Sequence, residues 1–154
     1  MQRIGELLVS SFGLEAAALE AALLLQKEKG GQLGAILVRQ GAIGEEAVLA
    51  ALGMQYGLEV RQFLPEQLDP FFVPRVGITL LKKFRMIPVA TADQLFLAMA
   101  EPMYFQQADD LAKLLNWQGV ERVLTTEKAI SAAINKAYDM ARSDTADQVM
   151  QDMD

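Results

Sequence analysis

Apolar positions in the first 57 residues recur at intervals of three and four, which is the period of a helix and not of a strand. The segment is rich in Ala, Leu, Glu and Gln, all good helix formers. Gly-containing breaks divide it, because Gly after a helix supplies a left-handed cap. Four short helices are predicted, over Arg3–Ser11, Glu15–Lys29, Gln32–Gln40 and Glu45–Tyr56.

The pattern changes after residue 57. A connector over residues 59–77 contains Pro65, Pro70 and Pro74, so it is expected to hold short helical turns at most. A helix is expected over residues 77–85. Two apolar runs, Met86–Ala90 and Leu95–Ala100, flank the polar turn "TADQ", which predicts a β-hairpin.

The rest of the chain predicts a helix, a short strand and a final helix. The helix falls within residues 103–117 and the strand within "GVERVLTT", residues 119–126. Thr126 is the expected N-cap of the last helix. That helix carries one apolar stripe at helical spacing, formed by Ile130, Ala133, Ile134, Ala137, Tyr138 and Ala141.

Together these elements predict an α+β fold in two subdomains. Residues 1–57 are expected to form a four-helix unit, and residues 58–142 a small α/β sandwich-like subdomain. Residues 143–154, "SDTADQVMQDMD", contain four Asp and no Lys or Arg. We interpret them as an acidic tail or linker.

The helical segment contains an internal repeat with a shift of 29 positions. Residues 3–26 and 32–55 align without a gap, and Lys27–Gly31 lie between them. Similar apolar residues occupy further positions, such as Leu19 and Val48. Eight pairs are identical: Gly5/Gly34, Leu8/Leu37, Val9/Val38, Ala18/Ala47, Ala21/Ala50, Ala22/Ala51, Leu23/Leu52 and Gln26/Gln55.

The repeated Gly has two explanations at this stage. Gly inside a helix costs about 0.5–1 kcal/mol relative to Ala, so a reason for it is needed. One explanation is structural: two helical hairpins pack together and each Gly permits a close approach. The other is functional: a helix N-terminus with a bare Gly can receive phosphate, and a preceding Arg can make bidentate contacts to phosphate or guanine.

Composition narrows the chemistry. The chain has no Cys and no His, which argues against thiol or His-based catalysis and against most zinc sites. Net charge is −6 and the Lys and Arg residues are scattered, so DNA or RNA binding is not expected. No apolar run is long enough to predict membrane insertion. Adjacent carboxylates such as Glu45 and Glu46 indicate solvated helix faces. We predict no catalytic residues, no metal site, no cofactor and no enzymatic activity.

The doubled motif resembles the N-terminal, MshEN-type domain of type II secretion and type IV pilus assembly ATPases. That family carries RLGxxLVxxGxIxxxxLxxxLxxQ in tandem. The stretches "KKFRMIPVA", "QLFLAMAEP" and "ADDLAKLL" also resemble the family, and the likeness covers nearly all of residues 3–141. The ATPase's phosphate-binding loop, GxxxxGK[ST], is absent.

The resemblance implies a cyclic di-GMP site, because ligand-binding members hold that nucleotide in the tandem motifs. The implied residues are Arg3, Ile4, Gly5, Leu8 and Gln26 in one half, and Gln32, Leu33, Gly34, Leu37, Gly41 and Gln55 in the other. Two positions depart from the motif. Gln32 replaces an Arg and lacks its charge and fork. Phe12 replaces a Gly, although Gly13 follows it.

Two functions follow from the resemblance. One is a non-enzymatic regulatory domain that binds cyclic di-GMP, with an affinity weakened by Gln32. The alternative is a docking domain that links a secretion or pilus motor to its membrane platform and binds no nucleotide. The implied partners are a secretion or pilus ATPase and an inner-membrane platform protein. The expected location is the cytoplasm, with attachment to the inner membrane through a partner.

Overall fold

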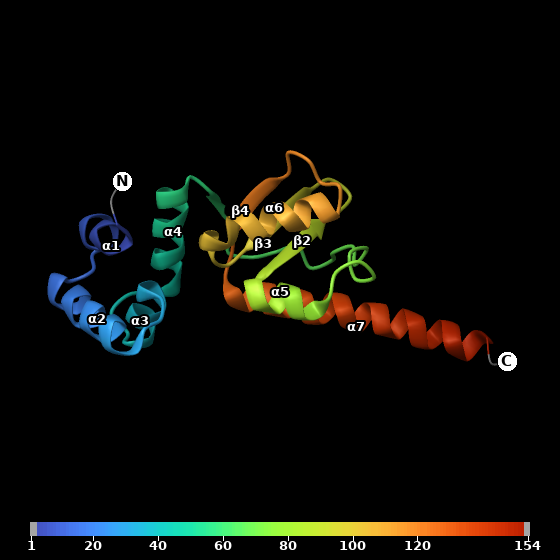
Figure 1. The fold of residues 1–154 in the computed structure, drawn as a ribbon, viewed down its shortest axis with the longest axis horizontal. Coiled ribbons are helices and arrows are strands. Elements are labelled where there is room, and N and C mark those ends of the chain that lie inside the picture. Colours follow the sequence, from blue (N-terminus) through green and yellow to red (C-terminus); the bar gives the residue numbers. More distant parts are fainter. Residues whose placement is uncertain (1–2, 153–154) are drawn as a thin grey trace. The chain divides into compact units, whose positions relative to one another are not determined.

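The computed structural model describes the backbone of residues 3–152 and the side chains of residues 3–141. The chain divides into two compact units, residues 1–60 and 61–154. The sequence places this division at residue 57, a few residues earlier. Figure 1 shows helices alone up to residue 57 and strands mixed with helices after it.

Unit 1 consists of four helices, as predicted. They are α1 (Ile4–Phe12), α2 (Ala16–Lys29), α3 (Leu33–Arg39) and α4 (Glu45–Tyr56), and the short strand β1 (Glu59–Val60) follows. Helix α1 packs against α4, and α2 packs against α3. The first helix of each repeat therefore lies against the second helix of the other, which joins both repeats in one core. The buried side chains of that core are Leu7, Leu8, Leu14, Ala22, Leu33, Ile36, Leu37, Val48 and Ala51.

Unit 2 is built around a β-sheet covered by helices. It contains α5 (Ile78–Phe84), β2 (Met86–Ala90), β3 (Leu95–Met99), the 3₁₀ turn η1 (Pro102–Tyr104), α6 (Phe105–Leu114), β4 (Glu121–Leu124) and α7 (Glu127–Asp152). Within unit 2 the order of the strands is β4-β3-β2. Strands β2 and β3 are antiparallel, whereas β3 and β4 are parallel and are connected through α6.

Both faces of the sheet are covered. Successive residues of β2 and β3 are buried, although neighbouring side chains in a strand point to opposite faces. Helices α5 and α7 contact each other and β2. Figure 1 shows α6 on the other side of the strands from α5 and α7. This layering agrees with the α+β, sandwich-like fold predicted for the second half.

The Pro-rich connector is fixed in the core of unit 2 by one aromatic residue. Phe72 has no exposed surface. Its ring contacts those of Phe71 and Tyr138 edge-on, with centroid distances of 5.7 and 6.1 Å. The hydroxyl of Tyr138 donates a hydrogen bond to the carbonyl of Val76 at 2.6 Å, and burial raises the pKa of this phenol. The connector is therefore an integral part of the unit.

Strand β2 lies at one edge of the sheet, and its outward side is partly closed. The N–H of Thr91 points toward β3, since it donates to the carbonyl of Gln94. The carbonyl of Ala90 points the other way and accepts the N–H of Asp69 at 3.0 Å. The backbone groups of successive residues point alternately to the two sides of a strand. The backbone nitrogen of Pro88, two residues before Ala90, therefore points outward as well. Pro has no N–H to offer there.

The final helix begins as predicted but continues further. The hydroxyl of Thr126 accepts the N–H of Ala129 at 3.0 Å, which confirms the predicted N-cap. The helix ends at Asp152, so the segment read as an acidic tail or linker is helical through residue 152. The physical reason is that residues 127–154 contain neither Gly nor Pro. Residues 153 and 154 lie outside the described residues. None of the described helices combines the length and apolarity needed to cross a bilayer.

Candidate functional site

Each repeat begins at the N-terminus of a helix. Arg3 is the N-cap of α1 and Gln32 is the N-cap of α3, and both have extended backbones. Both residues are exposed, and neither side chain forms a capping hydrogen bond. The first N–H groups of these helices therefore lack a side-chain cap from the residue that precedes them.

The repeated Gly is explained by packing. A methyl group at Gly5 would lie 2.7 Å from Cδ1 of Leu19 in α2, and one at Gly34 would lie 2.6 Å from Cγ1 of Val48 in α4. Leu19 and Val48 are themselves equivalent in the repeat. Each Gly therefore lets the first helix of a repeat sit directly on an aliphatic side chain of the second. This supports the structural explanation whether or not a ligand binds.

The starts of the two repeats lie next to each other. A methyl group at Gly5 would lie 3.4 Å from Cδ2 of Leu33, so the first turn of α1 is adjacent to the first turn of α3. The amide nitrogen of Gln26 donates to the carbonyl of Gly31 at 3.0 Å. The last residue of the first repeat thus holds the peptide that precedes Gln32.

The predicted site residues divide by burial into core, intermediate and surface positions. Leu8 and Leu37 have no exposed surface, and Gly5 and Leu33 are also buried, so all four belong to the core of unit 1. Ile4, Gln26, Gly34 and Gln55 are half-buried, and Arg3, Gln32 and Gly41 are exposed. The surface of the predicted site is therefore formed by its polar residues and by backbone. Ligand contacts of these residues stay a prediction.

The first repeat has Phe12 where the second has Gly41, and the residue after it, Gly13, takes the role of the Gly that ends the helix. Gly41 has φ +72°, in the left-handed region that favours Gly. Phe12, its equivalent, is the last residue of α1, and Gly13 takes the left-handed conformation with φ +76°. Helix α1 is therefore longer than α3, and the Phe12 side chain packs against the core of unit 1.

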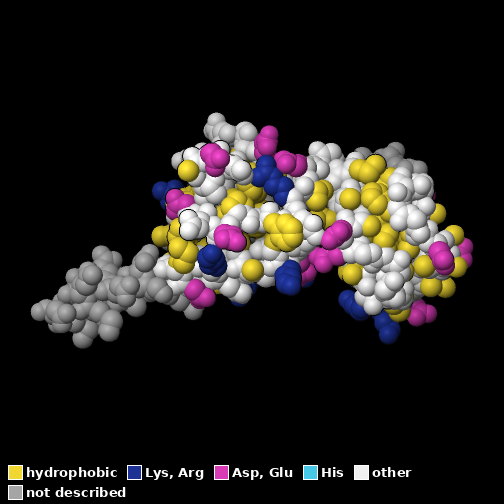
Figure 2. Space-filling view, turned by 180° about the vertical axis from the view of Figure 1, so that it is seen from behind, with side chains coloured by type: hydrophobic (Ala, Val, Ile, Leu, Met, Phe, Trp, Pro, Cys, Tyr) yellow, Lys and Arg dark blue, Asp and Glu magenta, His cyan; other side chains and the backbone are white. Residues whose placement is uncertain are grey.

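Leu19 and Val48 support the helices that carry the candidate site, and sequence reasoning did not select them. They position α1 and α3 by receiving the two glycines. The signal was present, because the repeat aligns Leu19 with Val48 as it aligns Gly5 with Gly34. The distribution of charged side chains does not mark out a binding site in the same way. Figure 2 shows Lys and Arg spread singly among Asp and Glu on the face drawn.

Gly34→Ala is expected to lower the free energy of unfolding by about 1–2 kcal/mol, since overpacking costs about 1–3 kcal/mol and Ala regains part of this as helix propensity. Val48 is β-branched and stiff, so it cannot rotate away from the new methyl group. Gly5→Ala is the matched control and should cost less, because the Leu19 side chain can move. Denaturant unfolding measures both. A positive coupling with Val48→Ala in a double-mutant cycle supports the contact, and strictly additive effects contradict it.

Comparison with solved structures places the fold. The structure of MshE with cdg matches with a TM-score of 0.73 and 29% identity, covering 90% of this chain and 100% of that one. The N-terminal domain of XpsE matches with a TM-score of 0.45 and 27% identity, covering 88% and 97%. The four-helix unit with its internal repeat and the unit built on a sheet thus define a two-unit α+β domain with the fold of the MshE structure.

The chain belongs to the MshEN domain family. The family's sequence profile matches residues 56–144, which are mainly unit 2. The type IV pilus assembly ATPase PilB of Myxococcus xanthus is 31% identical over 137 residues, 88% of this chain and 24% of PilB. PilB of Thermus thermophilus is 47% identical over 57 residues, 37% of this chain and 6% of that protein. The chain thus spans a quarter or less of these curated relatives.

Proposed function

We propose that this chain is a non-enzymatic regulatory domain that binds cyclic di-GMP through the tandem motifs of unit 1. The observation that carries the proposal is the convergence of the two motif starts, where Gly5 and Leu33 are neighbours. Two equivalent helix N-termini side by side suit a ligand with two equivalent halves. The likeness to MshE with cdg supports the same ligand.

The contacts that cyclic di-GMP would make follow from the chemistry of helix N-termini and of the residues before them. The N–H groups of the first turns of α1 and α3 point toward the helix N-termini, where an anion is favoured. The exposed Arg3 stands directly before one of these turns and can hold a phosphate or a guanine edge with two parallel hydrogen bonds. Gln32 stands at the equivalent position with a neutral amide. One half-site therefore carries a charge that the other lacks, and a weakened affinity follows.

The names of the relatives supply the biological setting of the proposal. They are pilus assembly ATPases and a domain of XpsE, so the domain would pass its ligand state to a secretion or pilus motor. Its partners would be such an ATPase and an inner-membrane platform protein. Its place would be the cytoplasm, at the inner membrane through those partners.

Calorimetric titration of the chain with cyclic di-GMP tests the proposal. We expect heat of binding with one ligand per chain and a rise in the melting temperature of the protein, since a ligand that binds only the folded state stabilises it. Guanosine monophosphate is the control, because it offers only one of the two halves and should bind much more weakly. Absence of both heat and thermal shift at high micromolar cyclic di-GMP would overturn the assignment.

A docking domain without nucleotide binding is the second candidate. The exposed side chain of Phe63 favours it, since 80% of its surface is accessible in unit 2. Large exposed aromatic residues are typical of protein interfaces. If cyclic di-GMP fails to bind while Phe63→Ala weakens capture of a purified motor or platform protein, docking is the function. Unchanged capture by Phe63→Ala contradicts this candidate surface.

Gln32→Arg is expected to strengthen cyclic di-GMP binding about tenfold or more. Arg adds a charged, bidentate donor at the second half-site, and hydrogen bonds to charged groups contribute about 1.5–3 kcal/mol. The same titration measures the gain. Gln40→Arg, on the exposed end of the same helix segment, is the matched control for added charge. An equal gain from both variants, or from neither, contradicts the role of position 32.

A further inference from the structure

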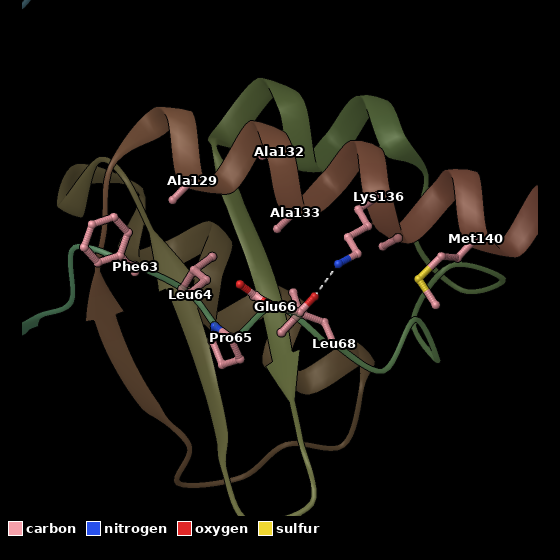
Figure 3. Close-up of a pocket in the computed structure, with 11 residues that line it drawn as sticks. Phe63, Leu64, Pro65, Glu66, Leu68, Ala129, Ala132, Ala133, Lys136 and Met140 are labelled. Carbon is pink, nitrogen blue, oxygen red and sulfur yellow. Dashed lines mark hydrogen bonds between the residues drawn. The ribbon is translucent and has the colours of Figure 1, made fainter.

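Unit 2 contains an apolar groove, whereas the tandem motifs belong to unit 1. It lies between residues 63–68 of the connector and one side of α7, and its volume is about 250 Å³ (Figure 3). Phe63, Leu64 and Leu68 line the connector side. Ala129, Ala132 and Ala133 line the helix side, and their short side chains leave the space open. Most of the lining surface is apolar.

One cation faces this apolar space. Figure 3 shows the Lys136 side chain reaching from α7 toward the connector, where its ammonium donates to the carbonyl of Glu66 at 2.6 Å. An ammonium group has three N–H donors. No ion pair of Lys136 with another described side chain accompanies this bond. Two donors of a full positive charge are thus available beside the groove.

We propose that this groove binds an aliphatic carboxylate, with the alkyl chain between the connector and α7 and the carboxylate on Lys136. Water gains little from walls that are mostly apolar, so an alkyl chain displaces it favourably. The size selects a medium-chain ligand, because an apolar cavity of about 150 Å³ holds benzene and drug-sized molecules need about 300–1,000 Å³. The charge of Lys136 selects a carboxylate over a neutral alcohol.

This site is independent of the proposed cyclic di-GMP function. The groove is formed wholly by residues of unit 2, whereas the tandem motifs lie in unit 1. The two assignments can therefore fail separately. A variant that closes the groove should retain nucleotide binding, and Arg3→Ala should retain carboxylate binding.

Octanoate is the probe, and 1-octanol and acetate are its comparisons. Amide NMR shifts of the whole chain follow the titration, with a dissociation constant on the order of 1 mM expected for a ligand of this size. Shifts should concentrate in residues 63–68 and on the adjoining side of α7. Octanol should bind about fivefold more weakly because Lys136 is exposed and its charge is partly screened. Acetate should not bind.

Two variants with matched controls decide the assignment. Ala132→Leu fills the groove and should abolish binding, whereas Ser131→Leu adds the same side chain outside the lining. Lys136→Gln should weaken octanoate about fivefold and leave octanol unchanged, whereas Lys128→Gln should change neither. The proposal is overturned if octanoate causes no amide shifts at a concentration of about ten times the expected dissociation constant. It is also overturned if octanol binds as tightly as octanoate. The same holds if a lining variant and its matched control change octanoate binding equally.

Discussion

Replacing Phe72 by Ala is expected to lower the free energy of unfolding by about 3–5 kcal/mol, the usual cost of deleting a fully buried aromatic ring. Phe72 has no exposed surface and contacts the rings of Phe71 and Tyr138. Its removal would leave a cavity between the connector and α7, and would also remove two aromatic contacts. A loss of this size is a large part of the stability of a small domain.

Denaturant unfolding followed by circular dichroism measures this loss. Phe63→Ala is the matched control, because Phe63 lies in the same connector but is 80% exposed. Its effect should stay within about 0.5 kcal/mol, as for most surface substitutions. If Phe72→Ala costs less than about 1 kcal/mol, the connector is not fixed in the core as the structure describes.

Arg3→Ala is expected to weaken cyclic di-GMP binding by about ten- to a hundredfold. The variant removes a charged bidentate donor that contributes about 1.5–3 kcal/mol. Arg3 is exposed at the N-cap of α1 and makes no capping bond, so its loss should leave the fold unchanged. The affinity of the unmodified chain should fall as salt is added, and that of Arg3→Ala should depend less on salt.

Two further variants separate charge from geometry. Arg3→Lys keeps the positive charge but loses the fork of the guanidinium, so its affinity should lie between those of the unmodified chain and Arg3→Ala. Arg39→Ala removes an exposed Arg from the last turn of α3 and should bind as the unmodified chain does. Equal affinities of Arg3→Ala and the unmodified chain would contradict the role of Arg3.

Helix and strand positions were predictable where the local signal was strong. The predicted range Glu45–Tyr56 coincides with α4, and the apolar run Met86–Ala90 coincides with β2. Strand β1 was missed because Glu59 and Val60 form too short a run to show alternation. The end of α7 was misplaced because charge composition was read as a tail, whereas nothing in that segment breaks a helix.

The sequence predicted which residues belong to the candidate site but not which side chains they pack against. The repeat identified Gly5 and Gly34, but their burial against Leu19 and Val48 depends on tertiary packing. The hydrogen bond from Gln26 to Gly31 likewise depends on the path of the loop between the repeats. Spacing within a helix says which residues share a face, and it does not say which helix covers that face.

The outward side of β2 also bears on how the protein behaves at high concentration. An open strand edge can template the addition of a strand from another molecule, which begins aggregation. An incoming strand at β2 would find no donor at Pro88 and a carbonyl of Ala90 already bonded to Asp69. Growth of an intermolecular sheet is thus hindered along this edge, because Pro88 has no N–H to donate and the carbonyl of Ala90 already accepts a hydrogen bond.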